Sequence, residues 1–171
     1  MIASKKVTTF LFCLYLLLLT WCVLFKFETQ FQYINFFQEK RMINWILFTQ
    51  PLIVNGDIVF AEMGFNLLFF VPLGVSLPLM FPKWSYVKII GSGFLLSLIY
   101  ESLQFILAIG KADVTDLLFN TLGLCIGLLL YPLLVKLFKN RVRFWINVIG
   151  IVCIGIPAIG LILFVIIGLL V

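Results

Sequence analysis

The chain has 171 residues, of which 64% are hydrophobic and 11% are charged, and its mean hydropathy is +1.22. Soluble globular domains are about 45–50% apolar and about 25% charged, so this composition excludes a soluble enzyme, a disordered tail and a secreted disulfide scaffold. Histidine is absent, which excludes His-ligated zinc and Ser-His-Asp catalysis. The net charge of +5 has to be tested first as a signal of membrane topology.

Five stretches are long and apolar enough to cross a bilayer core, which needs about 20 apolar residues in a helix. They run over residues 7–25, 58–81, 86–109, 115–138 and 144–171. The first stretch follows two lysines, as a secretion signal does, but its apolar run is longer than the usual about 7–15 residues and no small-residue cleavage site follows. We therefore expect a single all-α domain over residues 1–171, an integral membrane bundle of five transmembrane helices.

The basic residues are distributed unevenly between the two sides of this bundle. Eight of them lie on the side of the N-terminus, in residues 5–6, 83–88 and 136–143, and four lie on the other side. Because an excess of Lys and Arg marks the cytoplasmic side, we predict a cytoplasmic N-terminus and an extracellular C-terminus. The net charge then reflects topology, and no nucleic-acid partner is expected.

One long loop, residues 27–57, lies on the predicted extracellular side. It is dense in Phe, Tyr, Ile and Trp, with Gln and Asn between them. Segments of this kind prefer the membrane–water interface. We therefore expect the loop to lie along the outer surface of the membrane rather than to act as a flexible linker.

Polar residues inside the spans are costly and are candidates for function. At about 1.5 Å per helical residue, three helices bring theirs to one level of the outer leaflet. These residues are Asn66, Glu101, Gln104, Asp116 and Asn120. Their i,i+3 and i,i+4 spacings place them on common helix faces. The sequence therefore predicts a polar pocket that opens to the cell exterior.

Structural roles compete with this prediction. Asp113 or Thr115 can cap the fourth helix, whose positive end also favours Asp116. The carboxamides of Asn66, Gln104 and Asn120 can serve as hydrogen-bond contacts between helices. Glu101 can form an ion pair with Lys111. The GxxxG spacing of Gly123 and Gly127 can have a role in close helix packing only.

Four motifs resemble the VanZ-like family, and most closely its members from glycopeptide-resistance clusters. The first two are N-x-x-x-F-x-P-x-G over residues 66–74 and E-x-x-Q over residues 101–104. The others are D-x-x-D-x-x-x-N-x-x-G over residues 113–123 and a segment over residues 41–48 similar to R-x-x-N-x-x-P-F. The resemblance runs from Tyr15 to about Leu130. Two departures are Leu47, where the family usually has Pro, and Lys111, near where many members carry Arg.

The resemblance implies a multi-pass protein of a bacterial plasma membrane, with a role in low-level resistance of a Gram-positive bacterium to teicoplanin-type lipoglycopeptides. It implies no reaction, because the motifs contain no recognisable nucleophile or phosphate-binding loop. It adds the loop residues Arg41 and Asn44 to the candidate site.

Two hypotheses of function follow. In the first, the protein is an enzyme or modifier that acts on a lipid-linked cell-envelope molecule. Glu101, Asp113 and Asp116 would be catalytic, with Glu101 as general acid or base. The substrate-binding residues would be Arg41, Asn44, Asn66, Gln104 and Asn120. All of the possible metal ligands are oxygen donors, without His or Cys, so a bound metal would be Mg²⁺ or Ca²⁺.

In the second hypothesis the protein binds without chemistry. It would sequester the lipoglycopeptide, or mask its target among the membrane lipids, through the aromatic loop. A transporter is a weaker third alternative, because the sequence has no inverted repeat. The sequence also allows a homo-oligomer. Its interface would lie at Gly123 and Gly127 or at the terminal glycines Gly150, Gly155 and Gly160.

Overall fold

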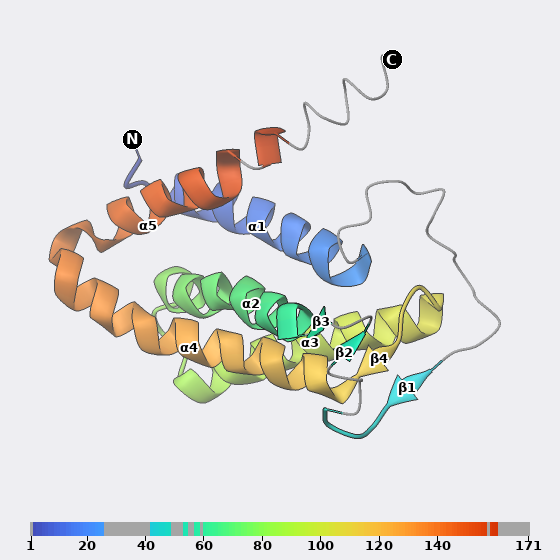
Figure 1. Cartoon of the computed structure of the whole chain (residues 1–171). Helices are drawn as coiled ribbons and strands as arrows, with labels where there is room; N and C mark the ends of the chain where they lie inside the picture. The colour runs from blue at the N-terminus through green and yellow to red at the C-terminus, as the bar shows by residue number, and fades with distance from the viewer. Residues whose placement is uncertain are drawn as a thin grey trace, which may run out of the picture. The chain divides into compact units, whose positions relative to one another are not determined.

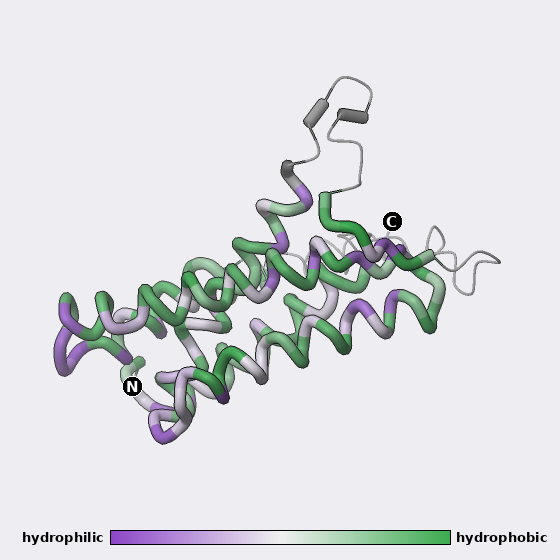
Figure 2. The backbone as a smooth tube through the Cα atoms, turned by 90° about the horizontal axis from the view of Figure 1, so that it is seen from below, coloured by the Kyte–Doolittle hydropathy of each residue, from purple (hydrophilic) through white to green (hydrophobic). Residues whose placement is uncertain are grey.

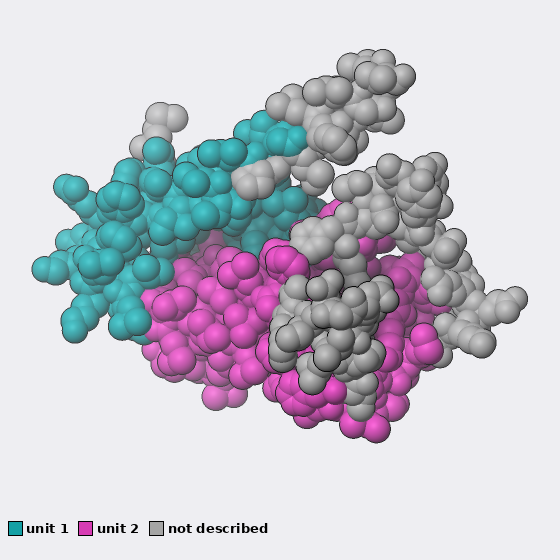
Figure 3. Space-filling view, viewed as in Figure 1, with its two compact units in different colours: residues 1–19, 132–171 teal, residues 20–131 magenta. Residues whose placement is uncertain are grey.

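The computed structural model describes residues 2–25, 42–48, 53–54, 57–58, 60–156 and 158–160. The chain divides into two compact units (Figure 3). Unit 1 consists of residues 1–19 and 132–171, and unit 2 consists of residues 20–131.

Helices account for nearly all of the regular structure (Figure 1). They are α1 (Lys5–Phe25), α2 (Phe60–Met80), α3 (Tyr86–Leu107), α4 (Val114–Phe138) and α5 (Val142–Gly150). A 3₁₀ turn (Lys139–Arg141) joins α4 to α5, and a π-helical turn (Ile151–Gly155) follows α5. The described residues also include two-residue strands, namely β1 (Ile43–Asn44), β2 (Ile53–Val54), β3 (Asp57–Ile58) and β4 (Ala112–Asp113). The all-α prediction is confirmed.

Within the described part of the chain four helices are long and apolar enough to span a membrane, and hydrophobic residues dominate their length (Figure 2). They are Lys5–Phe25, Glu62–Met80, Tyr86–Leu107 and the run Val114–Gly160, which includes the 3₁₀ turn between α4 and α5 and the undescribed residue 157. The chain is therefore a multi-pass membrane protein. The last run contains the fourth predicted span and the start of the fifth, whose final residues, 161–171, lie outside the described part of the chain.

Helix α3 ends two residues before the predicted span does. Ser85 caps its start, where the side-chain oxygen accepts a hydrogen bond from the backbone N–H of Lys88. At the other end Ala108 takes a left-handed conformation, with φ 50°. Its N–H bonds back to the last turn, and the chain reverses toward β4. Ala108 is 3% exposed, and the surrounding packing holds it in a conformation that is unfavourable for a residue with a Cβ.

Glycines hold α2 and α4 in close contact within unit 2. A methyl group on Gly123 would overlap the backbone carbonyl of Leu67, and one on Gly127 would overlap that of Val71. On the opposite helix, a methyl group on Gly74 would overlap the backbone of Leu124. The GxxxG spacing is thus used for packing inside the chain. Gly123 and Gly127 are both buried in this packing, and the homo-oligomer stays a prediction.

The short strands connect the loop to the helices of unit 2. Strands β2 and β3 pair antiparallel directly before α2. Strand β1 pairs parallel with β4, in a register that puts Ile43 opposite Ala112 and Asn44 opposite Asp113. The β1–β4 pair therefore fixes the middle of the loop at the start of α4.

In unit 1 the start of α1 lies against α5. The buried side chain of Asn147 donates hydrogen bonds to the backbone carbonyls of Ile2 and Ser4. Gly150 faces Leu11, whose Cδ1 lies 3.2 Å from the position of an added Cβ. The two helices are therefore joined by an amide anchor at one end and by side-chain packing a turn later.

Candidate functional site

Asp113 is the centre of a buried hydrogen-bond chain in unit 2. Its backbone N–H donates to Oε2 of Glu101 over 2.8 Å. Its Oδ1 accepts the backbone N–H of Thr115 over 2.8 Å, which is the geometry of a helix N-cap. Its Oδ2 accepts a hydrogen bond from the Nδ2 of Asn44 over 3.0 Å. Asp113 therefore caps α4 and also ties both α3 and the loop to it.

Asn44 fastens the loop to this centre. While Nδ2 bonds to Asp113, its Oδ1 accepts the backbone N–H of Ile46 over 3.4 Å and so closes a tight turn. The turn ends at Phe48, which has a positive φ of 59°. Its N–H donates to the Oγ1 of Thr115 over 3.2 Å, and its ring meets Phe119 edge-on at 6.3 Å between centroids.

A positive φ is a strained conformation for an aromatic residue, at a typical cost of about 1–3 kcal/mol, and it persists only where the surroundings impose it. At Phe48 the hydrogen bond and the ring contact do so. The segment Met42–Phe48 is therefore docked on the start of α4 by backbone pairing, one buried amide and one aromatic contact.

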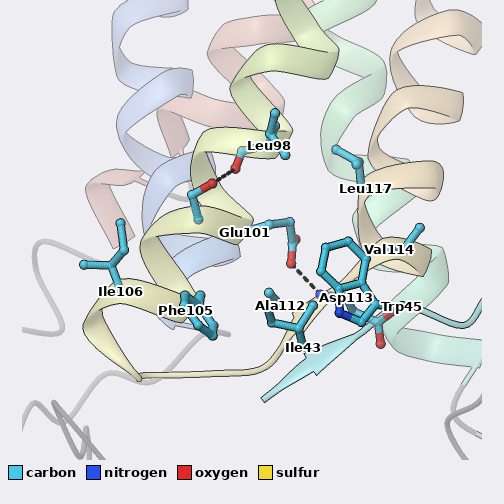
Figure 4. A pocket seen from close by; sticks show the side chains of 11 residues that line it. Ile43, Trp45, Leu98, Glu101, Phe105, Ile106, Ala112, Asp113, Val114 and Leu117 are labelled. Carbon is cyan, nitrogen blue, oxygen red and sulfur yellow. Dashed lines mark hydrogen bonds between the residues drawn. The ribbon is translucent and has the colours of Figure 1, made fainter. Parts of the chain in front are cut away.

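This docking creates a pocket of about 340 Å³ between the loop, α3 and α4 (Figure 4). Most of its lining is apolar, and the polar part comes from Glu101, Ser102 and Asp113. The apolar lining consists of Ile43, Trp45, Leu98, Phe105, Ile106, Ala112, Val114 and Leu117. In Figure 4 the carboxylate of Glu101 reaches from α3 toward the backbone of Asp113, with the Trp45 ring beside it.

The polarity of this pocket differs from the prediction. From the sequence we expect carboxylates and carboxamides of three helices to share one polar chamber. In the structure Glu101 and Asp113 line the pocket, whereas Gln104, Asp116, Asn120, Asn66 and Asn44 are absent from its lining. Glu101 is 6% exposed, so its carboxylate is largely enclosed by apolar side chains and the backbone of β4.

Gln104 and Asn120 are instead buried contacts between helices. The Nε2 of Gln104 donates to the backbone carbonyl of Val23 over 2.8 Å, linking α3 to the end of α1. The Nδ2 of Asn120 donates to the Oγ of Ser97 over 2.9 Å, linking α4 to α3. Both contacts are of the kind expected if these two carboxamides serve as hydrogen bonds between helices. Their role in substrate binding stays a prediction.

The other predicted residues lie as follows. Asp116 is 9% exposed, in the first turn of α4, and shares a helix face with Asp113 and Asn120. Asn66 is half-buried on α2 and, within the described residues, is not part of the hydrogen-bonded set around Asp113. Arg41 lies outside the described residues. Among the described residues no three of Asp, Glu and Cys gather in a way that could hold a metal ion.

Several residues of this region were missed in the sequence-based prediction. Ser97 lies four residues before Glu101, at the spacing of one helix face, so the polar stripe on α3 extends further than predicted. Trp45 forms part of the pocket wall and is 74% exposed, but in the sequence it was one of many aromatic loop residues. Tyr100 shares a hydrogen bond of 2.9 Å with Thr20, which joins α3 to α1.

Comparison with known proteins agrees with the motifs. Residues 12–139 match the family described as VanZ/LLP1. The chain is 37% identical over 131 residues to Protein VanZ of Enterococcus faecium, in an alignment that covers 76% of each of the two proteins. No solved structure matches the chain. Because the family match spans well over half of the sequence, the chain belongs to the VanZ/LLP1 family.

Proposed function

We propose that this membrane protein contributes to resistance against teicoplanin and related lipoglycopeptides by acting on a lipid-linked molecule of the cell envelope. The reaction would take place at the pocket between the docked loop, α3 and α4. The observation that carries the proposal is the enclosed carboxylate of Glu101 in an otherwise mainly apolar pocket. The kinship with Protein VanZ supports the link to resistance.

The pocket suits a ligand with two chemical halves. Its apolar walls, formed by residues such as Leu98, Ile106 and Leu117, can accept a hydrocarbon chain that enters from the membrane. The carboxylate of Glu101 offers an acceptor for a hydroxyl or amine of the head group, and it can take up or give a proton there. In this proposal Asp113 positions Glu101 and the loop, because both of its carboxylate oxygens already accept hydrogen bonds.

We also propose five spans, with the N-terminus in the cytoplasm and the C-terminus outside. The support is the uneven distribution of Lys and Arg and the turn between α2 and α3, where Lys88 lies over the Trp84 ring at 4.7 Å. The pocket would then open at the outer leaflet. Cysteine labelling in intact cells tests this, after the four native cysteines are replaced: Met42→Cys should react with an impermeant reagent and Asn140→Cys should not.

Replacement of Glu101 by Gln tests the acid–base role. The Gln carbonyl can still accept the N–H of Asp113, so the fold should be retained while the ionisable group is lost. General acid–base catalysis contributes about 10²–10⁴-fold to a rate. We therefore expect the teicoplanin susceptibility of cells that carry Glu101→Gln to equal that of cells without the protein, at equal amounts of inserted protein.

The matched control is Glu62→Gln, the same chemical change in the first turn of α2 and outside the pocket lining. This variant should keep full resistance. Full resistance in Glu101→Gln cells would contradict the proposed chemistry, and equal loss in both variants would point to a general effect of charge.

A second candidate is binding without chemistry, in which the protein sequesters the antibiotic or masks its target. The docked segment favours this candidate, because Trp45 lines the pocket and its neighbours Ile46 and Phe48 are exposed like it. Purified protein in nanodiscs separates the two functions. Turnover of a lipid-linked precursor, followed by mass spectrometry, supports the enzyme. Saturable teicoplanin binding without product, lost in Trp45→Ala and retained in Glu101→Gln, supports the binding protein.

A further inference from the structure

The charges of the chain are divided sharply between the two units. Unit 1 holds six basic residues and no acidic residue, so its formal charge is +6. The basic residues are Lys5, Lys6, Lys136, Lys139, Arg141 and Arg143. Unit 2 holds six basic and seven acidic residues, so its formal charge is −1. No side-chain carboxylate within unit 1 can neutralise its cations.

The fold of unit 1 gathers these cations at one end of its helices. The side chain of Asn147 on α5 donates a hydrogen bond to the backbone carbonyl of Ser4. Lys5 and Lys6 follow Ser4 directly, at the start of α1. Arg143 lies one turn before Asn147, on the same face of α5. The remaining cations lie in the last turn of α4 and in the 3₁₀ turn that leads into α5. These six residues form the basic end of unit 1.

One cation of the basic end has an unfilled donor. The Nη1 atom of Arg143 is buried and has no hydrogen-bond partner among the described residues. The other five side chains are exposed. A buried guanidinium N–H without an acceptor is costly, and an external oxyanion would supply the acceptor in a geometry that suits arginine well.

Aromatic rings lie next to these cations and indicate where the anion comes from. The ring of Phe138 stacks on Trp145 at 5.3 Å between centroids, and Phe144 meets Trp145 edge-on at 5.5 Å. Trp side chains at the ends of membrane helices lie at the level of the lipid head groups. An oxyanion at this level is the phosphate of a lipid rather than a free ion.

We propose that the basic end binds the phosphate head group of an anionic phospholipid, with the half-buried Arg143 as the central contact and the five exposed cations around it. This site lies within unit 1 and is independent of the pocket in unit 2 and of its proposed function. In the orientation proposed above it faces the cytoplasmic leaflet, where juxtamembrane cations each contribute about 1 kcal/mol to attraction by anionic lipid.

The test uses the full-length protein in nanodiscs of phosphatidylcholine, titrated with phosphatidylglycerol and followed by native mass spectrometry of the retained lipid. The double variant Lys139→Gln with Arg143→Gln should reduce retention of phosphatidylglycerol by about fivefold for each charge removed. The matched control is Lys83→Gln with Lys88→Gln, which removes two cations from the turn between α2 and α3. This control should retain the lipid like the unchanged protein.

Three results would overturn the proposal. The first is equal retention of phosphatidylglycerol and phosphatidylcholine by the unchanged protein. The second is equal loss in the two double variants, which would mean a diffuse effect of net charge. The third is displacement of the lipid by millimolar inorganic phosphate, which would identify a site for free anions. Cysteine labelling of both double variants checks that the orientation in the membrane is unchanged, because these cations also determine topology.

Discussion

The two units treat their polar groups in opposite ways. In unit 2 buried polar side chains bond to one another or to backbone groups, as Asp113 does with Asn44, Thr115 and Glu101. In unit 1 the charged groups are of one sign, and five of the six are exposed. Unit 2 is thus organised mainly around internal partners, although the Oε1 of Gln104 and the Oδ1 of Asn120 have none among the described residues. Unit 1 instead presents charges of one sign, for which it holds no side-chain carboxylate.

The two units also differ in the atoms that their glycines contact. The glycines of unit 2 bring the backbones of α2 and α4 together, so that no side chain separates the helices at Gly74 and Gly127. In unit 1 the atoms nearest to an added Cβ on Gly150 belong to the Leu11 side chain, with Cδ1 the nearest. Backbone atoms cannot move aside locally, whereas a leucine can change its rotamer. The contact between α2 and α4 is therefore more rigid than the contact between α1 and α5.

The largest expected effect comes from Gly127→Val. A Cβ at this position would lie 2.9 Å from the backbone carbon of Val71 and 3.0 Å from the Cα of Gly74. Helices α2 and α4 would have to separate, and overpacking against backbone lies at the upper end of its usual cost, so we expect a loss of about 3 kcal/mol or more in the free energy of unfolding. Unfolding of the purified protein in mixed micelles measures it.

Two further glycine-to-valine substitutions test the difference in packing between the units. Gly64 on α2 has no atom within 4 Å of an added Cβ, so Gly64→Val should leave stability nearly unchanged. Gly150→Val in unit 1 should cost only about 1 kcal/mol, because Leu11 can yield. A loss in Gly150→Val as large as that in Gly127→Val would refute the difference in packing between the units.

A smaller effect is expected from Asp113→Asn. The Asn can still cap α4 through its oxygen, but its NH₂ group would face the NH₂ of Asn44 across a buried contact that is now 3.0 Å. Two donors without an acceptor cost about 1–3 kcal/mol, so we expect a loss of about 2 kcal/mol. The same unfolding measurement applies, together with protease sensitivity of the loop.

The reciprocal double variant tests whether Asn44 and Asp113 are joined by the hydrogen bond described above. In Asn44→Asp combined with Asp113→Asn the donor and acceptor exchange places, and the carboxylate introduced in the loop can still accept the N–H of Ile46. The double variant should recover most of the stability that Asp113→Asn loses, as a coupling energy between directly bonded residues. Additive losses would mean that the two side chains do not interact as described.

Much of the fold is visible in the sequence, because membrane-spanning length and hydropathy are local properties. The first predicted span, residues 7–25, corresponds to α1 at Lys5–Phe25, and the third, residues 86–109, to α3 at Tyr86–Leu107. The capping role of Asp113 was also accessible, since Asp before a helix is a common N-cap. The early end of α3 was not, because the left-handed turn is at Ala108 rather than at the nearby Gly110.

The pocket was predicted only in part. Glu101 was identified because a carboxylate inside a span is rare. The walls could not be identified, since Ile43 or Leu117 looks like any other apolar residue before the chain folds. The parallel pair of β1 and β4 joins residues about 70 positions apart in two-residue strands, which are too short for any periodic pattern. Asn44 entered the prediction through the family motif and not through its own sequence context.

The smallest expected effect comes from Tyr100→Phe in unit 2. It removes the hydroxyl that shares a hydrogen bond with Thr20, while the ring can keep its edge-on contact with Phe70 at 6.5 Å. Hydrogen bonds between membrane helices contribute about 0.6 kcal/mol on average, so we expect a loss of that size in the free energy of unfolding. Tyr86→Phe, at an exposed position, is the control and should change nothing. A loss near zero for both would mean that stability in unit 2 rests on its glycine contacts and the Asp113 centre, and that the internal pairing of polar groups serves mainly to position the helices.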